Sequence, residues 1–217
     1  MERMRKTSFV NGEFYHVYNR GTDKRAIFIN GADFDRFLKS MQEFNSIDPI
    51  GSIFQNSFAE NKLRRRTSKL VNIVCYCLNS NHYHFILEQI VDGGISEFIK
   101  RLAGGFTKYF NAKYDRTGVL FQGKFKANHI DSNEYLLHAS SYVNLNNQVH
   151  KIKHGFFKSS WDEYLGKAKN NFCKKTVILD QFNTSKEYQL FAQESLENIL
   201  KRKESLQELE VLLSLED

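Results

Sequence analysis

The sequence has little of several features that mark particular classes of protein. It contains one proline, three cysteines and no apolar run near the roughly 20 residues that a membrane-spanning helix needs. Three cysteines cannot all pair, and Cys75 and Cys77 lie inside an apolar run typical of a strand, so a reducing cytoplasm is expected rather than a disulfide framework. The N-terminus, MERMRKTSFVNGEF, lacks the apolar stretch of a signal peptide.

Acidic residues are fewer than basic residues in most of the chain. The 217 residues carry 31 Lys and Arg against 25 Asp and Glu, a net charge of +6. Residues 184–217 hold four Lys and Arg against eight Asp and Glu, a local charge of −4, which leaves +10 for residues 1–183. A basic body with an acidic tail favours nucleic acid as the partner of the body. No membrane partner is expected.

The hydrophobic pattern predicts strands and helices over the first 150 residues. Strands are expected over residues 12–21, 70–78, 82–90 and 118–130. Helices are expected over residues 33–44, 95–110 and 132–148, where apolar residues recur at three- and four-residue spacing. This order indicates an α+β, ferredoxin-like fold with a split βαβ arrangement, in which a four-stranded antiparallel sheet has helices on one face.

The pattern is poorer beyond residue 150. We therefore expect a domain of residues 1–150 and a C-terminal helical extension of residues 151–217, with a terminal helix over residues 186–213. In that helix Ile199, Leu206 and Leu213 repeat every seven residues, with Leu209 between them. This short seam suits packing on the body or on the partner chain of a homodimer.

Two histidines stand in the strand expected over residues 82–90. Side chains two positions apart on a strand point to the same face, so His82 and His84 project together while Tyr83 and Phe85 point the other way. Two imidazoles on one face can bind a divalent ion, although the same spacing also suits a polar surface. A third ligand would have to come from elsewhere, with positions left open for a substrate.

The helix expected over residues 132–148 can supply a ligand and a nucleophile. Tyr142 and Asn146 lie one turn apart. A phenol beside a metal ion suggests covalent chemistry on phosphate, whereas the alternative is an ordinary aromatic that packs on the sheet. Free tyrosine has a pKa of about 10, so Tyr142 would need a base or a metal ion, and His138 is a candidate proton partner.

Four segments, in this order, carry a resemblance to a known family: YHVYNRG, CYCLNSNHYHFILE, TGVLFQGKFKANHID and YLLHASSYVNLNNQV. Over about residues 9–150 the chain resembles the single-tyrosine HUH transposases of insertion sequences, in particular the REP-associated tyrosine transposases. The resemblance implies that His82 and His84 bind a divalent metal ion and that Asn146 stands where related enzymes place a third ligand. It also implies that Tyr142 cuts single-stranded DNA, leaving a 5′-phosphotyrosine and a free 3′-hydroxyl.

Two sites depart from the family pattern. Asn79 and Ser80 precede Asn81 where the family usually has Met-Pro, and Asn147-Gln148 follows Asn146 where the family has Pro-Val. Neither change removes a proposed catalytic group, but both reshape turns near the site. For the ion, two imidazoles and an amide with open positions suit Mg²⁺ or Mn²⁺.

Several cations are candidates for contact with DNA. Lys124 and Lys126 alternate on the strand expected over residues 118–130, so both can meet phosphates on one side. Further candidates are Arg20, Lys108, Lys113, Arg116 and the cluster Arg64–Arg66. Tyr109, Phe121 and Phe125 can stack on unpaired bases, although core packing is the alternative for each of them.

The sequence therefore predicts a cytoplasmic, metal-dependent transposase that nicks and rejoins single-stranded or hairpin DNA. Two rival functions stay open. One is a DNA-binding protein that has kept the fold and lost catalysis. The other is a replication initiator or plasmid relaxase that uses the same chemistry.

Overall fold

The structure is a computed structural model that describes residues 8–49, 51, 53, 68–153, 155–168 and 171–213, without the side chains of residues 206–213. The basic cluster Arg64–Arg66 lies outside the described residues, and so do the side chains of Leu206, Leu209 and Leu213. Their predicted roles stay predictions. Within the described ranges, no helix has both the length and the apolar character needed to cross a bilayer.

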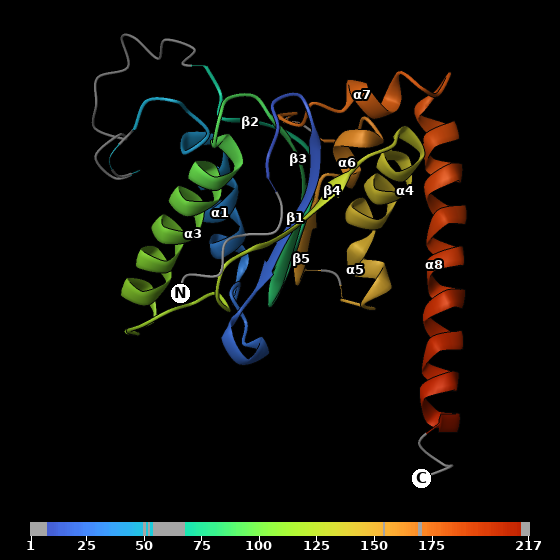
Figure 1. The fold of residues 1–217 in the computed structure, drawn as a ribbon. Helices are drawn as coiled ribbons and strands as arrows, with labels where there is room; N and C mark the ends of the chain where they lie inside the picture. Colours follow the sequence, from blue (N-terminus) through green and yellow to red (C-terminus); the bar gives the residue numbers. More distant parts are fainter. Residues whose placement is uncertain are drawn as a thin grey trace.

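Five antiparallel strands form one sheet in the order β4-β1-β3-β2-β5 (Figure 1). They are β1 Phe14–Arg20, β2 Val71–Asn79, β3 His82–Gln89, β4 Lys126–Ile130 and β5 Phe157–Ser159. The α+β class is confirmed, but the predicted count of four strands was wrong. The additional strand β5 pairs with the edge of β2, where Ser159 lies opposite Cys77. Three residues are too few to show a strand period in the sequence.

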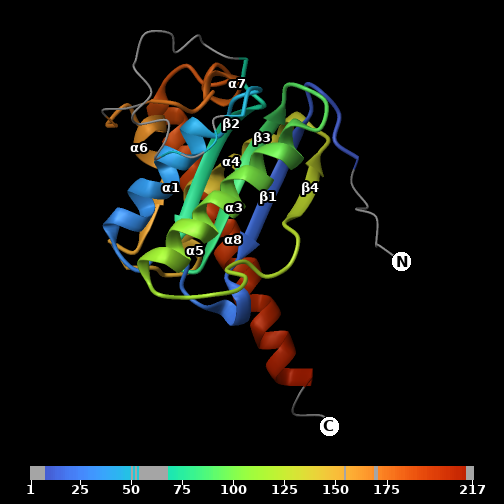
Figure 2. The ribbon, with the colours of Figure 1, turned by 90° about the vertical axis from the view of Figure 1, so that its left-hand side faces the viewer.

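Helices cover both faces of the sheet rather than the single face predicted (Figures 1 and 2). On one face, α1 (Gly31–Glu43) and α3 (Gly94–Lys113) pack on an aromatic core that includes Phe37, Phe85 and Phe106. The other face carries α4 (Asn133–Asn144), α5 (Asn146–Val149), α6 (Trp161–Tyr164), α7 (Thr176–Leu179) and α8 (Ser185–Leu213). Because both faces of β2 and β3 are covered, these strands are apolar over most of their length.

The strand expected over residues 118–130 is regular only from Lys126. Gly118 and Gly123 have φ angles of +82° and +62°, which interrupt the extended backbone ahead of β4. Lys124 therefore precedes the strand. A short 3₁₀ helix, η1 (Thr22–Lys24), follows β1 at the same end of the sheet.

The C-terminal extension shares the core of the second face. Tyr188 of α8 is fully buried, and its hydroxyl accepts from Asn144 Nδ2 at 3.0 Å and bonds with Ser140 Oγ at 3.0 Å, both on α4. Asn144 Oδ1 in turn accepts from Ser160 Oγ, just after β5, at 2.6 Å. The last turns of α8 extend beyond the body (Figures 1 and 2). The domain boundary at residue 150 stays a prediction, since residues on both sides of it contribute to this core.

Candidate active site

The two faces of strand β3 carry different kinds of side chain. Tyr83, Phe85 and Leu87 belong to the aromatic core under α1 and α3. His82 and His84 lie on the opposite face, toward α4, with their ring centroids 5.2 Å apart. His84 is 8% exposed and His82 is half-buried, so this pair is not an ordinary polar surface.

The neighbouring strand β1 adds a third imidazole, which the sequence reading missed. The His16 ring stacks on His84 with centroids 5.1 Å apart and planes 19° apart, and His16 Nε2 lies 2.8 Å from His84 Nδ1. Strand alternation alone puts His16, Tyr18 and Arg20 on one face of β1. Only the pairing of β1 with β3, in which Tyr18 lies opposite His84, shows that this is the face of the histidine pair.

The turn between β2 and β3 holds the His82 ring in one orientation. His82 Nδ1 lies 2.6 Å from Asn81 Oδ1, while Asn81 Nδ2 donates to the Lys24 carbonyl at 3.2 Å. An amide carbonyl can only accept a hydrogen bond, so Nδ1 of His82 carries the ring proton. The other nitrogen, Nε2, therefore presents a lone pair.

Two buried asparagines face that lone pair. Asn146 Oδ1 lies 3.2 Å from His82 Nε2, and Asn79 Nδ2 donates to both atoms, at 2.7 Å and 2.8 Å respectively. Both asparagine side chains are 0% exposed, and Asn146 Nδ2 has no hydrogen-bond partner among the residues that the structure describes. His82 Nε2 and Asn146 Oδ1 are therefore both acceptors, and both accept from Nδ2 of Asn79.

Helix α4 places Tyr142 beside the histidines. Its ring meets His84 and His16 edge-on, with centroid distances of 5.6 Å and 5.9 Å. The helix expected over residues 132–148 breaks between α4 and α5, but Tyr142 and Asn146 still reach the same region. Burial raises the pKa of the Tyr142 phenol, and the neighbouring Asn146 side chain acts in the opposite direction.

The candidate proton partner of Tyr142 faces elsewhere. His138 Nδ1 bonds with Ser195 Oγ of α8 at 3.0 Å, and its ring packs on Phe191. His138 lines a separate groove between α4 and α8. Because α8 packs along that side of α4, His138 does not face the cleft that Tyr142 lines.

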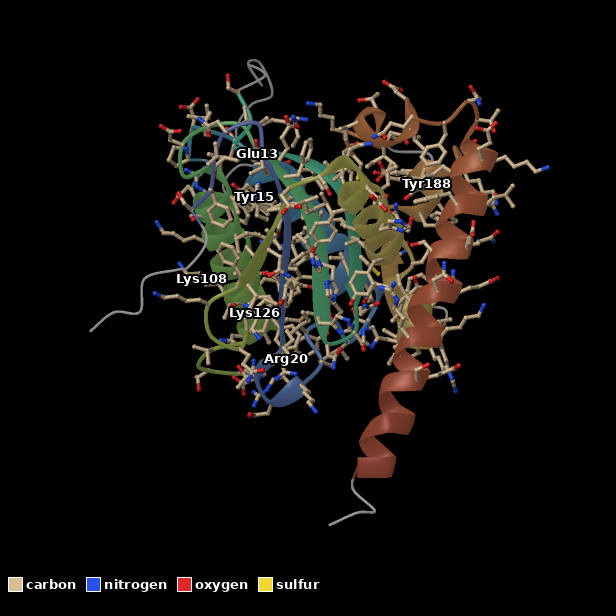
Figure 3. The ribbon with its side chains drawn as sticks, turned by 45° about the vertical axis from the view of Figure 1, so that its right-hand side comes forward. Glu13, Tyr15, Arg20, Lys108, Lys126 and Tyr188 are labelled. Carbon is tan, nitrogen blue, oxygen red and sulfur yellow. The ribbon has the colours of Figure 1, made fainter. Side chains whose placement is uncertain are left out.

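Tyr142, His82 and His84 line a cleft of about 890 Å³. Its cations are Arg20 at the end of β1 and Lys126 at the start of β4, both labelled in Figure 3, and Lys24 of η1. None of the described residues that line the cleft is an aspartate or a glutamate. A cleft with cations and no carboxylates favours an anionic ligand.

The other predicted DNA contacts lie outside this cleft. Lys108, Lys113 and Arg116 belong to α3 and the turn after it, and α3 lies across the sheet from α4 (Figure 1). The Lys113 ammonium is held by Asp33 at 2.6 Å, and Arg116 donates to the Asn111 side chain at 2.9 Å. Lys124 is exposed ahead of β4.

The aromatic side chains predicted to stack on bases are engaged within the protein. Phe121 is buried in the aromatic core, and the Tyr109 hydroxyl donates to Asp33 at 3.1 Å. Phe125 stacks on Phe9 with centroids 6.3 Å apart. The structure places none of the three among the described residues that line the cleft.

The electrostatics of the site favour uncharged imidazoles. Burial lowers the pKa of His82 to about 4 and holds the pKa of His84 well below its usual range. Both rings are therefore neutral at pH 7 and can bind a cation through a nitrogen lone pair.

Within the described residues, no three His, Cys, Asp or Glu side chains are grouped to hold a metal ion. A metal here would rest on two imidazoles and amide oxygen.

Residues 52–146 match the family model described as "Transposase IS200 like". The fold is similar to the solved structure of a REP-associated tyrosine transposase bound to a REP hairpin, with a TM-score of 0.55 and 12% identity over 79% of this chain and 90% of that chain. A protein from Deinococcus radiodurans R1 assigned as a transposase aligns over 63% of this chain and 91% of its own, with 13% identity and a TM-score of 0.38. No curated protein sequence matches.

The segment that matches the family carries His82, His84 and Tyr142, which line the cleft, and Asn146, which contacts His82 behind it. The similar solved structure shows that the fold around them extends over most of both chains. Over residues 52–146, the chain is thus similar to the IS200-like transposase family.

Proposed function

We propose that this transposase cuts and rejoins single-stranded DNA through a covalent tyrosine intermediate, with Mg²⁺ or Mn²⁺ as cofactor. The observation that carries the proposal is a phenol and two neutral imidazoles that line one cationic cleft, with a buried amide oxygen 3.2 Å from one of the imidazoles. All of these groups come from one chain. The proposal therefore does not require a homodimer, which stays a prediction from the seam in the terminal helix.

The donor set fits a hard divalent cation. His82 Nε2 and Asn146 Oδ1 are 3.2 Å apart, and neighbouring ligands of an octahedral ion bound at about 2.1 Å lie about 3.0 Å apart. Two lone pairs at this distance repel each other unless a positive group lies between them. His82, His84 and Asn146 would hold the ion, and the bound ion would supply Lewis acidity toward a phosphate oxygen.

Tyr142 is the nucleophile in this proposal. Its phenolic oxygen bonds to the scissile phosphorus and the bond from phosphorus to the 3′-oxygen breaks, which leaves a 5′-phosphotyrosine and a free 3′-hydroxyl. The phenol proton passes to water in the cleft, and the departing 3′-oxygen takes up a proton from water. Arg20 and Lys126 bind phosphates of the strand and hold it against Tyr142. Attack by an incoming 3′-hydroxyl on the phosphotyrosine reverses the step and rejoins DNA.

We extend the proposal to hairpin DNA with a single-stranded flank as the substrate. Its support is the similar solved structure, which is bound to a REP hairpin, together with a cleft whose charged lining residues, among those that the structure describes, are all cations. The phosphates of the unpaired flank would enter the cleft. The paired stem would remain outside it.

Incubation with a labelled hairpin in the presence of Mn²⁺ tests the proposal. The wild type is expected to form a DNA adduct that survives denaturing electrophoresis. Tyr142→Phe is expected to form none, because phenylalanine lacks the oxygen that bonds to phosphorus. Tyr135→Phe is a matched control on the same helix, since Tyr135 is 39% exposed and lines the other groove. This variant should form the adduct at the wild-type level.

A binding protein without catalysis is the second candidate. The departure of Asn147 and Gln148 from the family pattern favours it. The segment is nevertheless ordered, since Asn147 is 7% exposed and its carbonyl accepts from the Ile152 amide at 2.8 Å. Retarded migration of the hairpin without any covalent adduct of the wild type would support this candidate and contradict the enzyme.

A further inference from the structure

His16 contacts the histidine pair from outside the cleft. It is half-buried on β1 and is not among the described residues that line the cleft. Its closest polar contact to the site is the 2.8 Å hydrogen bond between its Nε2 and His84 Nδ1. His84 Nε2 is therefore the nitrogen of that ring left for a cation.

The direction of this hydrogen bond decides whether His84 can be a ligand. A hydrogen bond between two ring nitrogens 2.8 Å apart holds one proton, so one ring is the donor and the other is the acceptor. If His16 donates, the ring proton of His84 sits on Nε2 and blocks ligation. If His84 donates through Nδ1, its Nε2 offers a lone pair.

The rings packed around His84 hold it in place, so its hydrogen bond with His16 selects which of its nitrogens can bind a metal ion. Tyr18 stacks on His16 with centroids 5.0 Å apart and on His84 with centroids 5.6 Å apart. The Tyr142 ring packs edge-on against both imidazoles. Rotation of the His84 ring is sterically hindered in this packing. The position of the shared proton, rather than a ring flip, then determines which nitrogen can bind a metal ion.

The other proposed ligand is held in the same way. His82 Nδ1 bonds to Asn81 Oδ1, an acceptor, so that Nε2 of His82 is free for ligation. A ligating histidine normally donates its second N–H to an acceptor that orients the ring. For His84, the group in that position is His16 Nε2.

We infer that His16 is a positioning residue of the metal site: it accepts the Nδ1–H of His84 and keeps His84 Nε2 available to the cation. This inference rests on the proposed metal-dependent function. Loss of such an acceptor typically weakens metal binding by about 10- to 100-fold.

Calorimetric titration of the metal-free protein with Mn²⁺ tests the inference through two variants. His16→Phe keeps an aromatic ring in the stack but has no acceptor, so we expect Mn²⁺ binding about 10- to 100-fold weaker than that of the wild type. His16→Gln places a carbonyl oxygen near the position of Nε2 and is expected to restore most of the affinity. His129→Phe, on the exposed β4 histidine that pairs with Glu13, is the matched control and should bind like the wild type.

Nitrogen NMR of the His84 ring in the Mg²⁺-loaded wild type gives a second readout. The expected result is a proton on Nδ1. A proton on Nε2 would overturn the inference, and this measurement still decides it if His16→Phe does not fold. Equal Mn²⁺ affinity of a folded His16→Phe and the wild type would overturn the inference and leave the proposed function standing. Failure of the wild type to bind Mn²⁺ would overturn both.

Discussion

At the level of single residues, Asn79 joins two side chains of the candidate site, His82 and Asn146. It ends β2, is fully buried, and donates from one nitrogen to both His82 Nε2 and Asn146 Oδ1. The transposase family that the sequence resembles usually has methionine at the position of Asn79, and a methionine side chain offers no N–H donor. In this chain an amide therefore stabilises two acceptors that would otherwise face each other without a donor.

Asn79→Ala is expected to destabilise the metal-free protein by about 1–3 kcal/mol, because the buried Asn146 Oδ1 and the half-buried His82 Nε2 lose their shared donor. With saturating Mn²⁺ the loss should be smaller, since the ion takes the place of the N–H group. Urea denaturation in EDTA and in Mn²⁺ measures both values. Asn72→Ala on the same strand, whose amide bonds to Glu88, serves as the control. An equal loss in the two conditions would contradict the role given to Asn79.

At the scale of elements, Asp33 joins α1 to α3. Its carboxylate, 0% exposed, accepts from the backbone amides of Ile29 and Asn30 ahead of α1, at 2.8 Å and 3.2 Å. It also accepts from the Lys113 ammonium at 2.6 Å and the Tyr114 hydroxyl at 2.8 Å. Burial raises the pKa of Asp33, but Lys113 and the other donors outweigh burial, so the pKa lies below its usual value. This network occupies one of the lysines predicted to bind DNA.

Asp33→Asn is expected to lower the free energy of unfolding by about 2–4 kcal/mol near pH 6, because the carboxylate charge beside Lys113 and one of the two acceptor oxygens are lost. The folded pKa of Asp33 lies below the unfolded value of about 3.9, so its contribution is complete above that pH and disappears as the pH falls further. The difference between the two proteins should therefore shrink below about pH 4. Denaturation across this range measures it, with the exposed Asp35→Asn as control. A difference that does not change with pH would contradict the assignment.

Helix α8 supports the helix that carries Tyr142. Tyr188→Phe removes the acceptor of a buried Asn144 N–H and the partner of Ser140, for an expected loss of about 1–3 kcal/mol in unfolding free energy (Figure 3). Because α4 positions the phenol, formation of the DNA adduct should also slow. Leu190→Ala on the exposed side of α8 is the control, since this side chain is 59% exposed. Unchanged stability of Tyr188→Phe would show that the hydroxyl network contributes nothing.

Across the whole protein, the two faces of the sheet differ in what covers them. The face under α1 and α3 is an aromatic core, whereas the face under α4 combines a polar cleft with the packing of the C-terminal extension. Two lysines predicted as DNA contacts test this difference, because Lys126 lines the cleft and Lys108 lies on α3 (Figure 3).

Lys126→Ala is expected to weaken binding of single-stranded DNA and to reduce the slope of log affinity against log salt by about 0.7, the value for one lost phosphate contact. Lys108→Ala should change neither quantity. Fluorescence anisotropy at several salt concentrations measures both variants. A reduction of similar size for Lys108→Ala would show that DNA also contacts the α3 face.

Local sequence patterns were sufficient to predict a large part of the fold and of the candidate site. The two-residue period of a strand places His82 and His84 on one face, and helical spacing puts Tyr142 and Asn146 one turn apart, whatever the rest of the chain does. The order of strands and helices predicted the α+β class, and the ordered motifs pointed to the family. Each of these features depends on residues close together in the sequence.

The remaining features needed the folded chain, because they depend on contacts between distant segments. Pairing of β1 with β3 brings His16 to His84, and packing of α5 on β2 brings Asn146 to Asn79. Packing of α8 turns His138 toward Ser195, and the ion pair with Asp33 engages Lys113. Spacing along the chain carries no information on strand register, burial or the partner that each polar atom finds, and these decide which side chains meet at the cleft.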